Sequence, residues 1–228
     1  MVQMAGRPRE FDRGVALRQI QAVFWGRGYD GTSMADLVEA TGLASARLYA
    51  AFGSKEGAFR ESIELYELED GGFADRALTE ESSVTRALER MLRDAVDVYT
   101  RPQPRGCMVV SAATTCVSAD GSVRDWLQQH RRQRTQSIID RLDGAVAAGE
   151  LASDTDTKEL GDAFAALLQG LSVQARDHVP RKRLINLITP AMAMLGTAVA
   201  GYRRPSAALA TAPTLRDPPS TGDSSEHW

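Results

Sequence analysis

The chain has little of several residue types that mark whole classes of protein. Of its 228 residues, only two are cysteine and three histidine, and aromatic residues make up 6%. Two cysteines, Cys107 and Cys116, are too few for a disulfide framework. The three histidines are spaced too widely to suggest a metal site. There is also no Gly-rich phosphate loop and no nucleophile motif, so the sequence predicts no metal, no cofactor and no enzyme.

Long apolar runs are missing as well. No apolar stretch reaches the roughly 18 residues that a membrane span needs. The first residues, MVQMAGRPREF, lack the apolar segment of a signal peptide. By elimination, these absences predict a cytoplasmic protein with no membrane partner.

What is abundant is helix-forming sequence. Stretches of Ala, Leu, Arg and Glu favour helix, and no alternating run enriched in β-branched residues is found. Helices are expected over about 12–27, 33–40, 44–50 and from Ser54 through Tyr66. Further helices are expected over about 82–100, 105–117, 121–148, 155–178 and 181–201, which makes the fold all-α.

Charge is unevenly divided along the chain. The net charge is −3 overall, with +2 in residues 1–60 and −5 in the remainder. A mildly basic N-terminal part on an acidic body suits a local contact with nucleic acid. The asymmetry is small and is weak evidence alone.

The most informative stretch is GYDGTSMADLVEATGLASARLYAAFGSKEGAF, from Gly28 to Phe59. Ser33 followed by Asp36 has the form of a capping box that begins a short helix. Gly42 lies where the chain must turn sharply, a position that favours positive φ. Leu48 supplies the inner face of a second short helix. Two short helices joined by a tight Gly-containing turn form a helix-turn-helix unit.

The inward position of Leu48 sets the direction of its neighbours, because each helical residue turns by 100°. Ala46 points outward, Ser45 and Tyr49 lie on one flank, and Arg47 lies on the other. Arg47 can read guanine, while Ser45 and Tyr49 can reach phosphates or base edges. The alternatives are that Tyr49 is a core residue and Arg47 a solvated charge.

The N-terminal arm carries two further candidates. Arg7 and Arg9 can enter a narrow minor groove, where the negative potential is strongest. The alternative is a flexible terminus with no role.

The same residues give the chain a family resemblance. Thr32-Ser33, Gly42, Leu48-Tyr49, Phe52 and Ser54-Lys55 resemble the N-terminal hallmark of the TetR/AcrR family of bacterial regulators over residues 7–60. The resemblance implies a one-component transcriptional regulator that acts as a homodimer on double-stranded operator DNA. Repression from a palindromic operator, relieved by a small-molecule or thiol-reactive effector, is the family default. Ala44 departs from the pattern, since a Ser or Thr usually caps the third helix there.

The resemblance also assigns residue roles. It implies that Thr32, Ser33, Tyr49 and Lys55 contact phosphates, and that Ser45, Ala46 and Arg47 face bases. It divides the chain into a helix-turn-helix domain over 1–53 and a helical ligand-binding and dimerisation domain over 54–202. Residues 203–228, rich in Pro, Ser, Thr and Asp, are expected to form a disordered tail.

Two apolar stripes near the end of the second domain predict a dimer interface. In the family the last two helices pair with their copies as a four-helix bundle. The alternative is that the stripes serve only the core of one chain. The stripe residues are Leu160, Phe164, Leu167, Leu168, Leu171, Leu184, Ile188, Leu195 and Val199.

The middle helices are expected to enclose a pocket for an unidentified small-molecule effector, although each lining residue can instead be plain core. The candidates are Met91, Val98, Cys107, Met108, Val109, Trp126 and Ile138. Cys107 follows Arg105-Gly106 at the start of a helix, which can lower a thiol pKa, but a buried structural cysteine is the other interpretation. On a single helix, Cys107 and Cys116 lie too far apart for a disulfide within one subunit.

A helical protein-interaction module that binds no DNA is the competing hypothesis. It would leave Arg47 and Lys55 without a purpose. DNA binding by the chain separates the two.

Overall fold

The computed structural model describes residues 11–103, 106–115, 121–196 and 198. The described residues form eleven α-helices and no strand, so the predicted all-α fold is confirmed. The helices are α1 (Arg13–Arg27), α2 (Met34–Thr41), α3 (Ser45–Phe52), α4 (Lys55–Leu68), α5 (Phe73–Glu80), α6 (Val84–Tyr99), α7 (Met108–Thr115), α8 (Ser122–Ala147), α9 (Thr157–Arg176), α10 (Arg181–Asn186) and α11 (Ile188–Gly196). None of these helices is long and apolar enough to cross a membrane.

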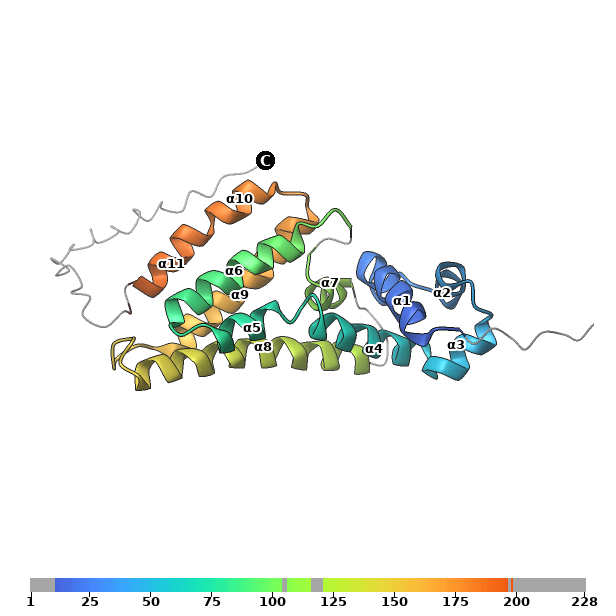
Figure 1. Cartoon of the computed structure of the whole chain (residues 1–228), viewed down its shortest axis with the longest axis horizontal. Helices are drawn as coiled ribbons and strands as arrows, with labels where there is room; N and C mark the ends of the chain where they lie inside the picture. The colour runs from blue at the N-terminus through green and yellow to red at the C-terminus, as the bar shows by residue number, and fades with distance from the viewer. Residues whose placement is uncertain (1–10, 104–105, 116–120, 197, 199–228) are drawn as a thin grey trace, which may run out of the picture.

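Helices α1–α3 form a small group at one end of the molecule (Figure 1). Their buried side chains meet those of α4, and the rings of Phe24 and Phe59 pack edge to face with centroids 5.1 Å apart. Leu37 of α2 and Leu48 of α3 are buried in the same core. Helix α4 therefore joins the N-terminal group to the larger helical body, which extends over α5–α11.

The ends of the N-terminal helices are set by local signals. The Asp12 carboxylate accepts the backbone N–H groups of Gly14 and Val15 at the start of α1. The predicted capping box of Ser33 and Asp36 is present at the start of α2. Gly42 ends α2 with φ of 66°, the left-handed conformation that favours glycine.

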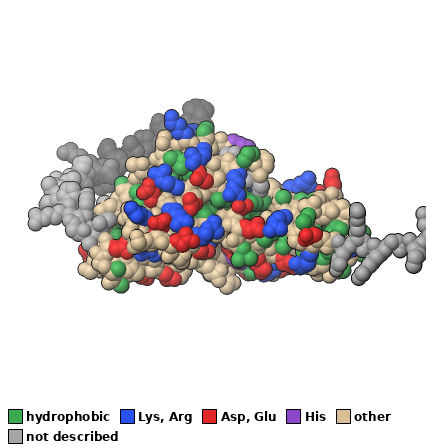
Figure 2. Space-filling view, viewed as in Figure 1, with side chains coloured by type: hydrophobic (Ala, Val, Ile, Leu, Met, Phe, Trp, Pro, Cys, Tyr) green, Lys and Arg blue, Asp and Glu red, His purple; other side chains and the backbone are tan. Residues whose placement is uncertain are grey.

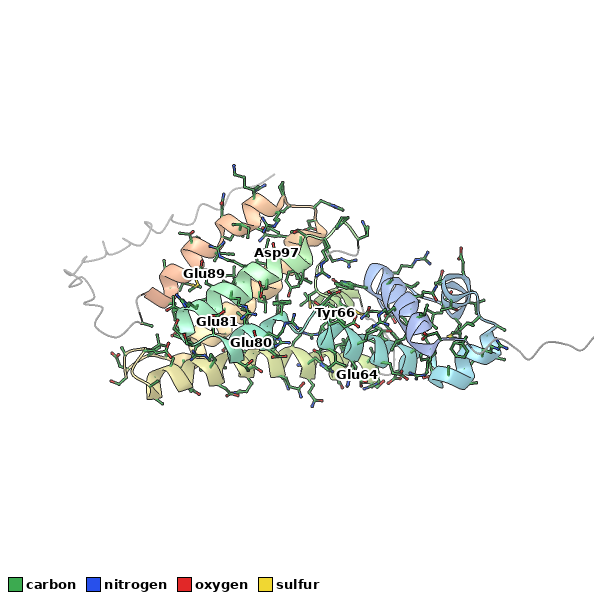
Figure 3. All side chains as sticks on the ribbon, viewed as in Figure 1. Glu64, Tyr66, Glu80, Glu81, Glu89 and Asp97 are labelled. Carbon is green, nitrogen blue, oxygen red and sulfur yellow. The ribbon has the colours of Figure 1, made fainter. Side chains whose placement is uncertain are left out.

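In the body, α9 packs against both α6 and the long α8. Gly161 permits the close approach of α8 and α9, because a Cβ at this position would lie 2.4 Å from Cγ1 of Ile139. At the surface, Arg90 of α6 pairs with Glu80 and Glu81 at 2.9 and 3.0 Å and ties the end of α5 to α6. Glu80 and Glu81 are labelled in Figure 3.

Two helical predictions differ from the structure. Helix α5 was not expected between Gly71-Gly72 and Ser83, because eight residues give little periodic signal. The single helix expected over 181–201 is divided near Leu187 into α10 and α11. Pro190 explains the break, since it has no N–H to donate to the carbonyl of Asn186. The predicted arm and tail lie outside the described residues, and the domain boundary at residue 53 stays a prediction.

Candidate functional site

The outer face of α3 is the first candidate site. Leu48 and Phe52 are buried, and this short helix packs against α2 and α4. Ser45, Ala46 and Arg47 are exposed, as the position of Leu48 predicts. Tyr49 is 48% exposed, which excludes the alternative that it is a core residue in this chain.

The chemistry of this face suits close contact with a polyanion. Among the described residues, Arg47 has no ion-pair partner, so its guanidinium is available to a ligand. The small side chain of Ala46 lets the helix backbone approach a groove closely. Ala44 gives α3 no side-chain cap, as its departure from the family pattern implied. Packing therefore has to hold this helix in place.

Thr32 and Lys55 hold the loop between α1 and α2. Thr32 is 1% exposed, and its hydroxyl donates to the Gly28 carbonyl oxygen at 2.7 Å. Lys55 Nζ donates to the carbonyl oxygens of Tyr29 and Thr32 at 3.1 and 3.0 Å, and it lies 4.2 Å from the centre of the Tyr29 ring. The expected phosphate contact of Thr32 stays a prediction, and because its hydroxyl is buried, the contact would have to use the Thr32 backbone. One of the three Lys55 donors remains for a phosphate.

Ser33 is exposed, and it is engaged in the start of α2. Its Oγ lies 3.2 Å from the Asp36 backbone nitrogen, which donates to it, and 2.6 Å from Asp36 Oδ2. The Ser33 backbone N–H donates to the same carboxylate oxygen at 2.7 Å. These hydrogen bonds from Ser33, assisted by Arg27, lower the pKa of Asp36. Ser33 therefore orients the first turn of α2, whatever else it contacts.

The second candidate site is a cavity of about 50 Å³ inside the helical body. Side chains from α4 through α9 enclose it, with apolar walls and several polar groups. The lining residues are Tyr66, Glu67, Gly71, Phe73, Tyr99, Cys107, Val109, Val110, His130, Arg131, Arg134, Ala165, Leu168 and Gln169.

Only two of the seven expected lining residues, Cys107 and Val109, reach this cavity. For the other five, the alternative was that they are ordinary core residues. The structure supports this alternative for four of them, which are buried in the apolar core: Met91, Val98, Met108 and Ile138. Trp126 lies between Arg60, 4.8 Å from its ring centre, and His130.

The polar lining was missed by the sequence reasoning. Tyr66 and Tyr99 are buried beside Cys107, and burial raises the pKa of both phenols. The sequence of α8 did contain a signal for this polar lining. Arg131 lies four residues after the buried Leu127, and Arg134 lies three residues after Arg131, so all three share the inward stripe of the helix. Arginine on a buried stripe indicates a polar cavity rather than ordinary core. Cys107 is a buried free thiol, and Cys116 lies outside the described residues.

The cavity adjoins the N-terminal helices. Trp25 at the end of α1 packs edge to face on Tyr66, with ring centroids 4.7 Å apart. The Trp25 indole N–H donates to the carbonyl oxygen of Gly106 at 3.0 Å, next to Cys107. Arg176 of α9 donates to the carbonyl oxygens of Trp25 and Gly26, both at 3.2 Å. Figure 3 labels Tyr66 where α4 lies beside α7.

The expected dimer stripe needs correction. Six of its members face the core of their own chain: Phe164, Leu168, Leu171, Leu184, Ile188 and Leu195. Leu160 and Leu167 are partly buried, and Val199 lies outside the described residues. The outward side of α9 instead carries Ala166, Gly170 and Val173, the last 43% exposed. Helical periodicity correctly predicted that these apolar residues are buried. It did not show whether the core of the same chain or a second subunit buries them.

A capped helix-turn-helix with an exposed second helix, joined to a helical body with an internal cavity, defines a helical DNA-binding regulator. Comparisons with known proteins agree. Residues 17–61 match the family described as "Bacterial regulatory proteins, tetR family", and residues 83–186 match "Tetracyclin repressor-like, C-terminal domain". The chain belongs to the TetR family of transcriptional regulators and is a DNA-binding transcriptional repressor, not an enzyme.

Individual relatives support this assignment. The chain is 32% identical over 184 residues to the HTH-type transcriptional repressor ComR of Escherichia coli (strain K12), covering 80% of this chain and 88% of ComR. It is 42% identical to a cysteine mutant of the TetR family regulator CifR in complex with 26-bp operator DNA. That alignment has a TM-score of 0.78 and covers 82% of this chain and 98% of CifR. A TetR regulator from Rhodococcus sp. RHA1 is 33% identical with a TM-score of 0.57, over 82% of this chain and 99% of its own.

Proposed function

We propose that the protein is a cytoplasmic homodimeric repressor that holds a palindromic operator through α3 of each subunit and releases it when an effector occupies the internal cavity. The observation that carries the proposal is the exposed face of α3, where Arg47 projects beside small side chains. An arginine in this setting reads guanine in the major groove. A cysteine mutant of CifR, which is 42% identical in sequence to this chain, forms a complex with operator DNA.

The expected contacts divide by chemistry. Ser45, Ala46 and Arg47 face bases, and Tyr49, Ser33 and the remaining donor of Lys55 face phosphates. The backbone around Thr32 belongs to the same surface, while its side chain supports the loop from inside. Arg7 and Arg9 are proposed to enter the adjacent minor groove. In Figure 2, basic and acidic side chains are interspersed over the visible face, so this face carries no broad basic surface.

The dimer contact is proposed on the outward side of α9 and on α11. Ala166, Gly170 and Val173 recur at spacings of four and three, which gives one stripe along the helix. Nothing lies within 4 Å of a Cβ built on Gly170, so a second helix has room to approach.

Control by an effector follows from the position of the cavity. Tyr66 lines the cavity and packs on Trp25, and Cys107 adjoins the carbonyl that Trp25 binds. An occupant that moves either group displaces the end of α1 and with it the helix-turn-helix. The helix-turn-helix then has a DNA-binding position and a displaced position. Operator DNA favours the first and the effector favours the second, so each ligand weakens the binding of the other by the same factor.

An electrophoretic mobility shift with DNA from upstream of the protein's own gene tests the proposal. We expect a complex that survives an excess of scrambled duplex. Equal competition by operator and scrambled DNA would refute sequence-specific binding. The same assay, with effector candidates added, tests release.

A further inference from the structure

The cavity contains two buried polar groups without a partner. Tyr66 is 2% exposed, it lines the cavity, and its hydroxyl has no hydrogen-bond partner among the described residues. Nη1 of Arg131, which lines the same cavity, is also buried, and no described residue forms a hydrogen bond with it. Leaving such groups unsatisfied is costly, and more so for a charged group. Two of them in one cavity indicate that a ligand supplies the missing acceptors.

The charges around Arg131 are already paired elsewhere. The Glu67 carboxylate lies 2.9 Å from Nδ1 of His130, and Arg134 pairs with Asp75. Among the described residues, no carboxylate lies within ion-pair distance of Arg131. Burial lowers the pKa of this guanidinium. A partly buried cation without a counter-ion favours an anionic ligand.

The other walls restrict the rest of that ligand. Phe73, Val109, Ala165 and Leu168 present apolar surface on the remaining sides. Since a water-sized atom occupies roughly 10–15 Å³ of such space, a cavity of about 50 Å³ holds only a few non-hydrogen atoms. The ligand is therefore small, with one anionic end and a short apolar end.

We propose that the cavity binds a small organic carboxylate, whose charged group pairs with Arg131 and accepts a hydrogen bond from the Tyr66 hydroxyl. Its short tail contacts Phe73 and Leu168. Because Tyr66 also packs on Trp25, binding moves the contact between the cavity and α1. Only this last step, the effect on DNA, rests on the proposed function.

Isothermal titration calorimetry of the full chain without DNA tests the site. The probes are acetate, propionate and butyrate, each compared with its neutral amide. We expect a carboxylate to bind at least about 10-fold more tightly than its amide, because charge-assisted hydrogen bonds are the stronger ones. This comparison requires no variant. Equal binding of acid and amide, or no binding of any of the three acids at millimolar concentration, would overturn the proposal.

Variants then identify the residues. Arg131→Gln is expected to weaken carboxylate binding by about 10- to 100-fold and Tyr66→Phe by about 3- to 10-fold. Arg131→Lys, which keeps the charge, is expected to restore part of the affinity. Arg132→Gln is the matched control, because Arg132 is the exposed neighbour on α8, and it should bind as wild type does. Equal losses for Arg131→Gln and Arg132→Gln would remove Arg131 from the site.

A mobility shift with upstream DNA separates the two proposals. A protein that binds upstream DNA specifically but no carboxylate contradicts the cavity proposal and leaves the repressor intact. A protein that binds carboxylate but no specific DNA contradicts the proposed function, while the proposed carboxylate site remains supported. Arg131→Gln protein that binds DNA normally and no longer responds to butyrate supports both.

Discussion

Arg47 and Arg131 carry the same side chain in opposite surroundings. Arg47 lies on the exposed face of α3, where water solvates its charge until DNA replaces that water. Arg131 projects from the inward stripe of α8 into a cavity, where little water is available to it. The first is suited to reading a large polyanion from outside. The second is suited to holding a small anion inside.

Arg47→Ala is expected to weaken operator binding by about 1–3 kcal/mol and to relax preference at one base position. Binding to scrambled DNA should change little, because base contacts carry the sequence preference. Fluorescence anisotropy with single-base operator variants measures both effects. Arg86→Ala, at an exposed position on α6, is the control. Equal losses on operator and scrambled DNA would remove Arg47 from base readout.

Asp36 gives the helix-turn-helix an acid-sensitive point. Ser33 lowers the pKa of this carboxylate, so its stabilising contribution is present above its ordinary pKa and is lost as pH falls through the lowered value. Asp36→Asn is therefore expected to be less stable than wild type at pH 7, and the gap should close below about pH 4. Urea unfolding from pH 7 to pH 3 measures this, with Glu39→Gln on the same helix as control. A gap that stays constant with pH would contradict the role of the charge.

At the scale of helices, α3 illustrates how the N-terminal group is held. Ala44 has the extended conformation of an N-cap, with φ of −61° and ψ of 144°, but its side chain offers no acceptor. The helix depends on Leu48 and Phe52, which are buried against the neighbouring helices. Tertiary packing replaces the local signal that begins α2 and α4.

Restoring the missing cap should stabilise the protein. Ala44→Ser places a hydroxyl where it can accept an N–H of the first turn, and we expect a gain of about 1 kcal/mol in the free energy of unfolding. Ala50→Ser, the same change at an exposed position within α3, should give no gain. Thermal and urea unfolding of both variants measure the difference. An equal effect at the two positions would show that capping is not the cause.

Local signals in the sequence predicted the helices well where they were strong. Asp36, Gly42 and Ser54 mark helix ends through bonds or backbone conformations within a few residues of themselves. The signals failed where the outcome depends on partners distant in sequence. Helix α5 is short, and the apolar stripe of α9 did not reveal whether α6 and α8 or a second subunit covers it. The cavity combines residues from six helices, which no local pattern connects.

At the scale of the molecule, the proposed dimer contact and the cavity lie on opposite sides of α9. The side with Phe164 and Leu168 faces the body and the cavity, while the side with Ala166 and Val173 faces outward. A two-fold interface on the outward side therefore places each cavity close to the contact between subunits. Occupation of the cavity and the separation of the two α3 helices are then connected through one helix.

Val173→Glu is expected to convert the dimer to a monomer, because two glutamates would meet across the two-fold interface at a cost of several kcal/mol. Size-exclusion chromatography with light scattering measures the mass. Gln128→Glu adds the same single negative charge at an exposed position on α8, and it should leave the dimer intact. A dimeric Val173→Glu protein would move the interface away from this side of α9.

The most direct test of the account is a hydroxyl-radical footprint of the protein on its upstream DNA. Two subunits that each place α3 in a major groove predict two protected patches on one side of the duplex. The patches should be related by two-fold symmetry, with centres one helical turn, roughly 34–36 Å, or a multiple of that apart. Arg47→Ala should lose this pattern at protein concentrations where Arg86→Ala keeps it. A single patch, or an unchanged footprint for Arg47→Ala, would contradict operator recognition by paired α3 helices.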